Sequence, residues 1–535
     1  MEKRDLKRLI KLEDRIRQIV TEDLGLKCMP IEWDVIPPTK MLEIMAYRSP
    51  TNISSWKFGR DYEKLRTVFD TVDPSLPYEV VINDNPIRAF LMNSNTLAVQ
   101  ALVIAHVYGH GSVFTESRWF QKSRRDIIEL LAEANKRFNN YEKMYGIDFV
   151  EETIDAGHSI QWHSNPFEEE TEDERRARVF EQKKMMNRPD MSEFADIVKS
   201  ERKKVVNPDN YNTKLWRELK ATTPVEPVED ILRYIIDNSR VLDDAQKDIL
   251  EILRTEGQYY WPVIKTKYLN EGFATYIHQM VMDKLFEEGL LTSAEHGQYN
   301  YSNSLVKARN PMTMNPYLVG SEMWKSIRDR WDKGKHGREW DECTMVAEKE
   351  NWDTKEMRGW EKCLDVMRSY TDWFFMQDFL TVKIVDDCDL YIYQKIETPV
   401  SIDYVRTEHS AEQVKDIIIS SFAHSGIPKI DVVNGNFGGH GILELVHRYA
   451  GVPLDKEYTK RTLRHINRIW GNPVILRTAV EDGDLLYHNK GEETSIEYAD
   501  GKVPEKSKLR GVKKNPPFGT KKNVPLQIDS PFLPV

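Results

Sequence analysis

Two histidines end the stretch Leu97-Ala-Val-Gln-Ala-Leu-Val-Ile-Ala-His-Val-Tyr-Gly-His110. Residues 97–105 are almost all apolar and contain no helix breaker, so they predict a buried helix that ends with the two histidines. Because residues four apart lie on one face of a helix, the imidazoles of His106 and His110 can reach one metal ion. Buried imidazoles need partners, and the alternative is two core histidines hydrogen-bonded to Tyr, Glu or backbone groups.

A second motif lies far downstream, in Asn270-Glu-Gly-Phe-Ala-Thr-Tyr-Ile-His278. Glu271 and His278 are seven residues apart, which places them on one helical face. With His106 and His110, Glu271 completes the ligand set of a zincin whose third ligand is a glutamate, and the expected cofactor is a divalent metal ion, zinc. His278 is predicted as a fourth ligand or as a group that orients Glu271, with a polar cap of the buried stripe as the alternative.

The usual catalytic base is missing from the first motif. Zincins of the His-Glu-x-x-His kind carry a glutamate directly after the first histidine, where this chain has Val107. Glu256 is our candidate for the catalytic base, because the aromatic segment Tyr259-Tyr-Trp261 would raise its pKa by desolvation. A turn between Tyr260 and Thr266, for which Pro262 offers a place, would bring Glu256 back beside Glu271. The commoner alternative is a glutamate in a surface salt bridge.

Three further residues are candidates for supporting the metal site. Asp155 and His158 are three residues apart on a predicted helix, and they would form a carboxylate–imidazole pair behind the ligands. A purely local hydrogen-bonded pair is the alternative. Tyr276, within the second motif, would donate a hydrogen bond to an oxyanion, although a tyrosine in this position is more often part of the packing.

Composition limits the class of protein. The chain has 535 residues, 40% of them hydrophobic, which is typical of a folded globular protein of two to four domains. Its 76 basic and 86 acidic residues give a net charge of −10, which argues against a general binder of nucleic acids or anionic membranes. No stretch approaches the roughly 18 apolar residues of a membrane span, and the four scattered cysteines indicate reduced thiols. A soluble, cytoplasmic protein is therefore expected.

Helical periodicity dominates most of the chain, and near residue 389 the pattern changes to alternating strands and helices. The predicted fold class is α+β, with a predominantly helical body and a small α+β C-terminal domain. Within the latter, residues 396–480 are expected to fold as a separable unit. The expected organisation is a helical domain at 1–165, a charged linker at 166–225, a second helical domain at 226–388 that packs with the first, the α+β domain at 389–490 and a basic, Pro-rich, disordered tail at 491–535.

A series of motifs, in this order, resembles the stage V sporulation protein R (SpoVR) family. The resemblance covers roughly residues 8 to 480. It is carried by the two motifs above and by Trp56-Lys-Phe-Gly-Arg60, Tyr78-Glu-Val-Val-Ile-Asn-Asp-Asn-Pro86, Ile154-Asp-Ala-Gly-His158, Asn315-Pro-Tyr-Leu-Val-Gly320 and Ile469-Trp-Gly-Asn-Pro473. One departure is Ser112, where the family commonly has a carboxylate. The family shares the missing glutamate after the first histidine.

The resemblance implies a role in bacterial sporulation, when the peptidoglycan cortex of the spore is built, or in stress responses. It also implies a PrkA-type serine kinase and a von Willebrand-like protein as partners. One hypothesis is a metal-dependent amide hydrolase with a zincin-like body, acting on peptides or peptidoglycan-related substrates. The alternative is a non-catalytic regulatory or scaffold protein that acts with the kinase and has a structural or vestigial metal site.

Overall fold

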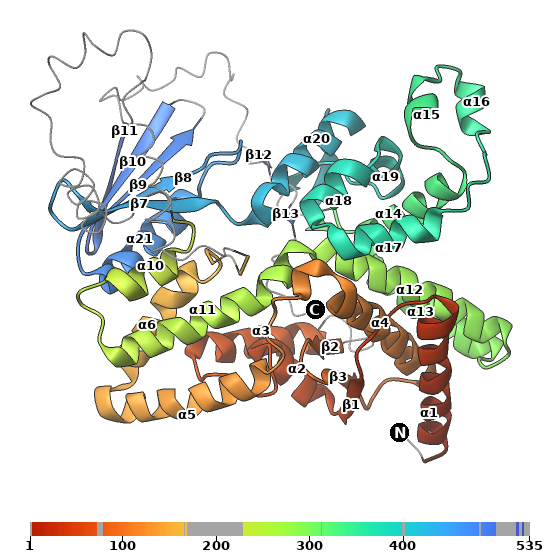
Figure 1. The fold of residues 1–535 in the computed structure, drawn as a ribbon, viewed down its shortest axis with the longest axis horizontal. Coiled ribbons are helices and arrows are strands. Elements are labelled where there is room, and N and C mark those ends of the chain that lie inside the picture. The colour runs from red at the N-terminus through yellow and green to blue at the C-terminus, as the bar shows by residue number, and fades with distance from the viewer. Residues whose placement is uncertain are drawn as a thin grey trace, which may run out of the picture. The chain divides into compact units, whose positions relative to one another are not determined.

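The computed structural model describes residues 3–71, 79–164, 166–167, 228–311, 313–397, 402–480, 483–498, 521–523 and 527–528. These residues form a mixed α+β fold that is mainly helical (Figure 1). Nearly all of the predicted linker and most of the predicted tail lie outside the described residues. At the start of that predicted tail the structure has a strand instead, β11 (Glu493–Tyr498).

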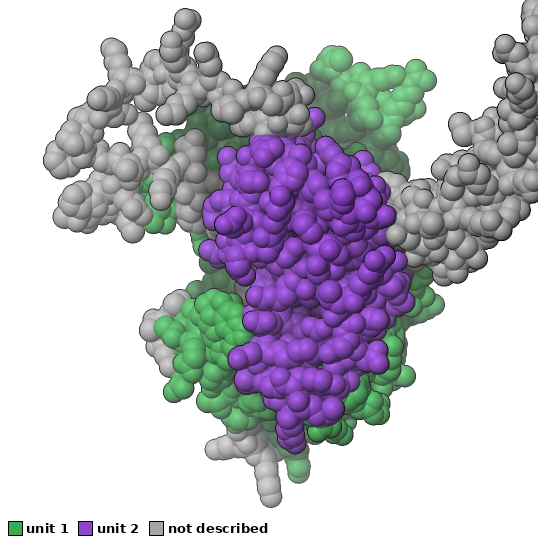
Figure 2. All heavy atoms as spheres, turned by 90° about the vertical axis from the view of Figure 1, so that its left-hand side faces the viewer, with its two compact units in different colours: residues 1–140, 259–426, 509–535 green, residues 141–258, 427–508 purple. Residues whose placement is uncertain are grey.

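The chain divides into two compact units, shown in different colours in Figure 2. Unit 1 contains residues 1–140, 259–426 and 509–535, and unit 2 contains residues 141–258 and 427–508. Each unit has its own hydrophobic core. This division differs from the predicted domain boundaries, because each unit is built from segments that are far apart in the sequence.

Unit 1 is predominantly helical. Its helices are α1 (Lys3–Gln18), α2 (Pro38–Tyr47), α3 (Trp56–Thr71), α4 (Leu97–Glu116), α12 (Lys267–Glu287), α13 (Ser293–Val306), α14 (Pro316–Asp332), α15 (Arg338–Glu342), α16 (Val346–Glu350), α17 (Gly359–Ser369), α18 (Asp372–Phe379), α19 (Val382–Asp387) and α20 (Ala411–Ser421). Three short helical turns are η1 (Ile19–Asp23), η2 (Arg118–Phe120) and η3 (Ala423–Gly426). Helices α5 (Ile127–Tyr145) and α11 (Asp244–Lys265) contribute residues to both units.

A three-stranded sheet in unit 1 has the order β1 (Ile31–Ile36), β3 (Ile87–Met92), β2 (Glu79–Ile82). β1 runs parallel to β3, whereas β2 runs antiparallel to it and begins with Glu79 opposite Leu91. Helix α4 follows β3 after a short turn, so this sheet and this helix are fixed next to each other. The shorter strands of the unit are β4 (Thr313–Met314), β5 (Tyr393–Glu397), β6 (Ile402–Arg406), β12 (Lys521–Asn523) and β13 (Gln527–Ile528).

Helix α4 is the central helix of the unit 1 core. Every residue from Ala98 to Phe114 is buried. Among the described helices, α4 alone has the length and apolar composition of a membrane span, and 94% of that apolar window is buried inside the protein. Burial on all sides is typical of a core helix. The expectation that no segment reaches the length of a span is therefore corrected, since α4 reaches it as part of a folded core.

Glycines bring three helices of unit 1 into direct backbone contact. A Cβ atom at Gly109 of α4 would lie 2.6 Å from the Cα atom of Ala274 on α12. A Cβ atom at Gly272 of α12 would lie 2.4 Å from the backbone of Gly320 on α14. Because real side chains essentially never come so close, only glycine allows α12 to pack between α4 and α14 at this distance.

The start of α12 is fixed by a residue from a distant part of the chain. The buried carboxylate of Asp372 accepts hydrogen bonds from the backbone N–H groups of Tyr268 at 2.9 Å and Leu269 at 2.8 Å. These are two of the N–H groups that the first turn of a helix leaves unpaired. The predicted turn between Tyr260 and Thr266 lies at Thr266, and not at Pro262, because α11 continues through the proline.

Unit 2 combines helices with a five-stranded sheet in the order β11-β10-β9-β8-β7. β8 and β9 are parallel and are connected by α21, and the other neighbouring strands are antiparallel. The remaining bounds are α6 (Ile147–Ile160), α10 (Ile231–Asn238), β7 (Ile430–Phe437), β8 (Ile442–His447), α21 (Lys456–Trp470), β9 (Val474–Val480) and β10 (Gly483–Lys490).

The sheet of unit 2 shares its core with helices from a much earlier part of the chain. Trp470 of α21 stacks on Tyr234 of α10, with ring centroids 5.9 Å apart, and both belong to a core that includes residues of α6, α11 and the strands. The backbone of Val228 also pairs with Val432 of β7. Residues 396–480 therefore do not form the separate unit that the sequence pattern predicts, and residues 402–426 belong to unit 1.

Candidate metal centre

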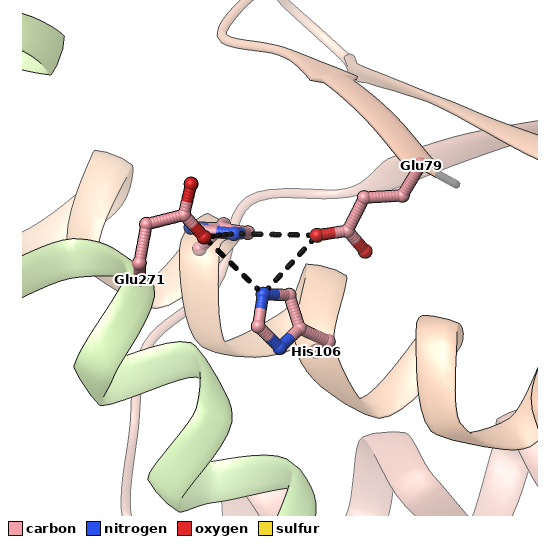
Figure 3. A group of neighbouring side chains, drawn as sticks. Glu79, His106 and Glu271 are labelled. Carbon is pink, nitrogen blue, oxygen red and sulfur yellow. Dashed lines mark ion pairs between the residues drawn. The ribbon is translucent and has the colours of Figure 1, made fainter. Parts of the chain in front are cut away.

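Four side chains converge in unit 1, namely Glu79 of β2, His106 and His110 of α4, and Glu271 of α12. Figure 3 labels Glu79, His106 and Glu271. One nitrogen or oxygen atom from each lies within 4.8 Å of the other three. His106 Nε2 is 3.1 Å from Glu79 Oε1 and 3.6 Å from Glu271 Oε2. His110 Nε2 is 3.5 Å from each of these oxygens. The structure thus brings together three residues that the motifs single out, and it adds Glu79.

The geometry of these four donors fits a divalent metal ion. A regular tetrahedron with metal–ligand bonds of about 2.1 Å has edges of about 3.4 Å, close to the 3.1–3.6 Å between the imidazoles and the carboxylates. The Nε2 atoms of His106 and His110 and the Oε2 atom of Glu271 are buried and make no hydrogen bond. Buried polar atoms of this kind are rare unless an ion or a water molecule satisfies them. Imidazole and carboxylate ligands suit zinc and other first-row metals.

Both histidines are held from behind through their second ring nitrogen. His106 Nδ1 is 2.9 Å from His278 Nδ1, and His278 Nε2 is in turn 3.0 Å from Asn303 Oδ1. His110 Nδ1 is 3.0 Å from Asn270 Oδ1. Histidines that bind metals almost always use their other nitrogen in this way, because the hydrogen bond fixes the orientation of the ring. The surroundings of the two imidazoles are therefore those of metal ligands.

Attraction between imidazoles and carboxylates dominates the electrostatics of the centre. Burial by itself lowers the pKa of His110, but the carboxylates of Glu271 and Glu79 outweigh it and raise the pKa to about 10. Burial opposes the ionisation of Glu271, yet His106 and His110 lower the pKa of this carboxyl well below its ordinary value. His278 differs, because burial and the neighbouring His106 hold its pKa well below the usual range. Without a metal ion, the centre is thus held together by ion pairs around a protonated His110.

The chain matches family models over most of its length. A family model described as SpoVR like protein matches residues 3–427, and one described as SpoVR-like C-terminal domain matches residues 428–481. This chain belongs to the SpoVR family. A curated relative, "Uncharacterized protein YcgB" of Escherichia coli (strain K12), is 27% identical over 484 residues, which cover 86% of this chain and 90% of the relative. No solved structure was found to match the chain.

The two SpoVR family models meet where the structure also changes from one unit to the other. The second model begins at residue 428, and the last segment of unit 2 begins at residue 427. All four residues of the candidate centre lie in the part matched by the first model. The match to the C-terminal domain of the SpoVR family therefore contains β7, β8 and β9 of the unit 2 sheet and none of the four converging donors.

Glu79 is the member of the SpoVR centre that motif spacing did not reveal. It lies on a strand, 27 positions before His106, so no helical periodicity connects the two. The available signal was a single carboxylate at the start of an otherwise apolar strand, in Glu79-Val-Val-Ile82. Its side chain is 12% exposed, compared with 3% for Glu271. Glu79 is therefore the more accessible of the two carboxylates.

Two predicted residues lie elsewhere than expected. His278 is buried behind His106 and is not one of the four converging donors, because seven residues of α12 separate it by about 10 Å along the helix from Glu271. Glu256 is fully buried, and it is also not one of the four donors. It lies on α11 in the segment assigned to unit 2, whereas the four donors belong to unit 1.

The remaining candidates make local contacts. His158 Nδ1 pairs with Gln161 Oε1 within unit 2, and Asp155 lies close enough to His465 to oppose the lowering of its pKa by burial. Tyr276 is buried in unit 1, and its hydroxyl accepts a hydrogen bond from Arg328 at 3.1 Å. None of the interactions described at the four donors involves Asp155, His158 or Tyr276.

Proposed function

We propose that this SpoVR-family protein is a metal-dependent amide hydrolase, with zinc held by His106, His110 and Glu271 in a zincin-like arrangement. The observation that carries the proposal is the second carboxylate, Glu79, which faces the same pair of imidazoles and is the most exposed of the four groups. A hydrolytic zinc centre needs three protein ligands and a carboxylate beside the open position. Glu79 has the chemistry for this second role, which the sequence prediction gave to Glu256.

Each side chain would then have one task. A bound zinc ion supplies a Lewis acid that polarises a carbonyl group and makes a water molecule more acidic. Glu79 would accept the proton of that water at Oε1 and later deliver it to the leaving amine. Glu271, with its pKa held low, stays ionised and offsets the positive charge of the ion. His278 and Asn270 keep the two imidazoles in position from behind.

The proposed substrates are peptides or peptidoglycan-related peptides, because the SpoVR family is connected with the spore cortex and with stress responses. This substrate class rests on the family and on the amide chemistry of the centre. A mass-spectrometric screen of peptides and of peptidoglycan fragments with the zinc-loaded full chain tests it. Cleavage of a linear peptide alone, without any cleavage of peptidoglycan fragments, would argue against the link to the cortex.

A second candidate is a regulatory or scaffold protein with a structural metal ion. The observation in its favour is that the four imidazole–carboxylate separations, 3.1–3.6 Å, are close to the edges of a tetrahedral site, so that Glu79 would be a fourth ligand and would leave no open position. The protein would then act through a PrkA-type serine kinase and a von Willebrand-like protein. In that case His106→Ala would weaken binding to the kinase, measured by surface plasmon resonance, although no reaction is catalysed.

The variant Glu79→Gln separates the two candidates. If Glu79 is the base, the variant keeps one zinc ion per chain and loses about 10²- to 10⁴-fold in turnover, because glutamine keeps the shape without accepting a proton. If Glu79 is a fourth ligand, the variant loses metal affinity, and the wild-type protein shows no turnover. Zinc content and peptide cleavage are measured on the same samples.

Two further variants serve as controls. Glu32→Gln changes an exposed glutamate of β1, in the same sheet, that pairs with Arg88, and it should alter neither metal content nor turnover. Glu256→Gln tests the residue that the sequence nominated. Loss of turnover in Glu256→Gln with full activity in Glu79→Gln would overturn the role proposed for Glu79.

A further inference from the structure

A bound metal would determine which residue is the donor and which is the acceptor in the hydrogen bond between His106 and His278. Their Nδ1 atoms are 2.9 Å apart, and both side chains are almost completely buried. At this distance one nitrogen must carry a hydrogen and donate a hydrogen bond, and the other must accept that bond with its lone pair. A metal ion takes the lone pair of His106 Nε2, so the proton of this imidazole must be on Nδ1. His106 therefore donates, and His278 accepts at its own Nδ1.

The same reasoning extends one step further along the chain of contacts. A neutral His278 that accepts at Nδ1 carries its proton on Nε2, which faces Asn303 Oδ1 at 3.0 Å. The amide oxygen of Asn303 accepts a hydrogen bond from this N–H group and is the last acceptor of the chain of hydrogen bonds. The three groups thus form one directed chain, in which His106 donates to His278 and His278 donates to Asn303.

We propose that His278, set by Asn303, is a positioning residue that fixes the tautomer and the ring orientation of the metal ligand His106. The inference rests on the proposed metal centre and concerns its affinity, whether or not the centre is catalytic. The structure gives His110 an independent partner, because its Nδ1 faces Asn270 Oδ1. The two imidazoles are therefore oriented by different side chains, His106 by His278 and His110 by Asn270.

The charge of the centre explains why these partners are neutral. Two neutral imidazoles, two carboxylates and a divalent ion add up to zero, which suits a group that is almost completely buried. A carboxylate behind His106 would strengthen the imidazole as a ligand but would leave a net negative charge inside the core. An imidazole and an amide supply the acceptors without that cost.

Helix α12 supplies the partners of both histidines as well as one of the ligands. Asn270, Glu271 and His278 all belong to α12, which contributes a ligand and the partner of each histidine, while α4 contributes the two imidazoles. The two turns between Glu271 and His278 place the second residue behind His106, not beside the ion. The spacing in the second motif therefore encodes one ligand and one positioning group.

The test compares variants that keep or remove the acceptor. His278→Leu removes it, and zinc affinity should fall about ten- to a hundredfold, the effect usual for the loss of such a partner. His278→Gln retains an oxygen acceptor and should recover much of the affinity. Asn303→Leu should weaken zinc binding to a lesser degree, whereas Asn303→Asp should maintain or tighten it. Tyr276→Phe on the same helix removes a hydrogen bond away from the centre and is the matched control.

Zinc affinity is measured by competition with a chelator, and the melting temperature of the metal-free protein is measured in parallel. A positioning role predicts lower affinity in His278→Leu with an unchanged metal-free melting temperature, whereas a merely structural role would lower the melting temperature. Unchanged zinc affinity in both His278→Leu and Asn303→Leu would overturn the inference. Absence of zinc binding by the wild-type protein would instead overturn the proposed function, so the two failures are distinguishable.

Discussion

At the scale of single residues, a proton and a metal ion compete for the same ring nitrogen of His110. The carboxylates of Glu271 and Glu79 raise the pKa of this imidazole to about 10 despite its burial. At neutral pH the metal-free protein therefore holds a proton on His110, and a metal ion must displace it. The carboxylates thus have two opposite effects on metal binding. They attract the ion, and they also stabilise the proton on His110 that the ion must displace.

This competition predicts opposite pH trends for the metal-free and the metal-bound protein. The raised pKa of His110 stabilises the metal-free fold below the unfolded value of 6.5, and this contribution is lost as the pH rises through about 10. Zinc affinity should rise over the same interval, by roughly tenfold per pH unit while one proton is released. Calorimetry in two buffers of different ionisation enthalpy measures the released proton. An affinity that is independent of pH between 7 and 9 would contradict the assignment.

The sequence revealed the three donors of this centre that lie on helices and missed the one on a strand. The four-residue spacing of His106 and His110 and the second motif at Glu271 suffice, because periodicity relates residues on one helix face. The sequence did not predict Glu79 as a member of the centre, because its position depends on how a strand packs against a helix. No local sequence pattern records such packing. His278 is also on α12, but spacing alone could not show that it contacts His106 at the ring nitrogen that faces away from the two carboxylates.

At the scale of elements, the centre depends on how closely α4 approaches α12. Gly109 lies between the two histidines on α4, and a Cβ atom there would be 2.6 Å from Ala274 Cα and 3.0 Å from Ala274 Cβ. Because both contacts involve backbone or short side chains of a core helix, no flexible side chain can give way. The helices themselves would have to separate, and Glu271 would move away from the imidazoles with α12.

Gly109→Ala should therefore damage both stability and metal binding. We expect a loss of about 1–3 kcal/mol in unfolding free energy from overpacking, and zinc affinity reduced at least tenfold. Gly297→Ala is the control, because this exposed helical glycine of α13 has nothing within 4 Å of the added methyl group. The control should stabilise the protein by about 0.5–1 kcal/mol. Chemical denaturation and chelator competition measure both quantities, and wild-type zinc affinity in Gly109→Ala would refute the argument.

Amphipathic helices can be read from the sequence, whereas the position of the turn between α11 and α12 can be read only approximately. Helices α5, at residues 127–145, and α21, at residues 456–470, have apolar residues at helical spacing. The turn predicted between Tyr260 and Thr266 occurs at Thr266, the end of that interval, and not at Pro262. Its cause is tertiary, since Asp372 holds the first turn of α12 from more than a hundred residues away. Local propensity contains no information about such a contact.

At the scale of the whole molecule, two hydrophobic cores coexist with one candidate metal centre. The first core and the four donors belong to unit 1, and the second core joins the C-terminal sheet to α6, α10 and part of α11 in unit 2. The sequence pattern placed β7 to β10 in an α+β segment and left β11 outside it, and it could not assign the helices that share the core of the sheet. Those helices end long before the sheet begins, at residues 160, 238 and 265 compared with residue 430, so only the folded chain reveals the partnership.

The separation of the cores predicts that metal binding and the packing of unit 2 are independent. Leu463 of α21 is 1% exposed in the second core, and Leu463→Ala should cost about 2–5 kcal/mol by leaving a cavity. Hydrogen exchange followed by mass spectrometry should show faster exchange in α21 and β7–β10 of this variant, with unchanged zinc affinity. Leu285→Ala, in the first core on α12, is the matched substitution and should speed exchange in α4 and α12.

Added zinc should affect the hydrogen exchange of Leu285→Ala and Leu463→Ala differently. A ligand that binds only the folded state at a hundred times its dissociation constant contributes about 2.7 kcal/mol, which should offset much of the damage in Leu285→Ala. The same zinc concentration should leave the fast exchange of Leu463→Ala in place, because no donor of the centre comes from unit 2. Slower exchange of β7–β10 on adding zinc would contradict this independence, and it would mean that the C-terminal domain of the SpoVR family senses the metal centre.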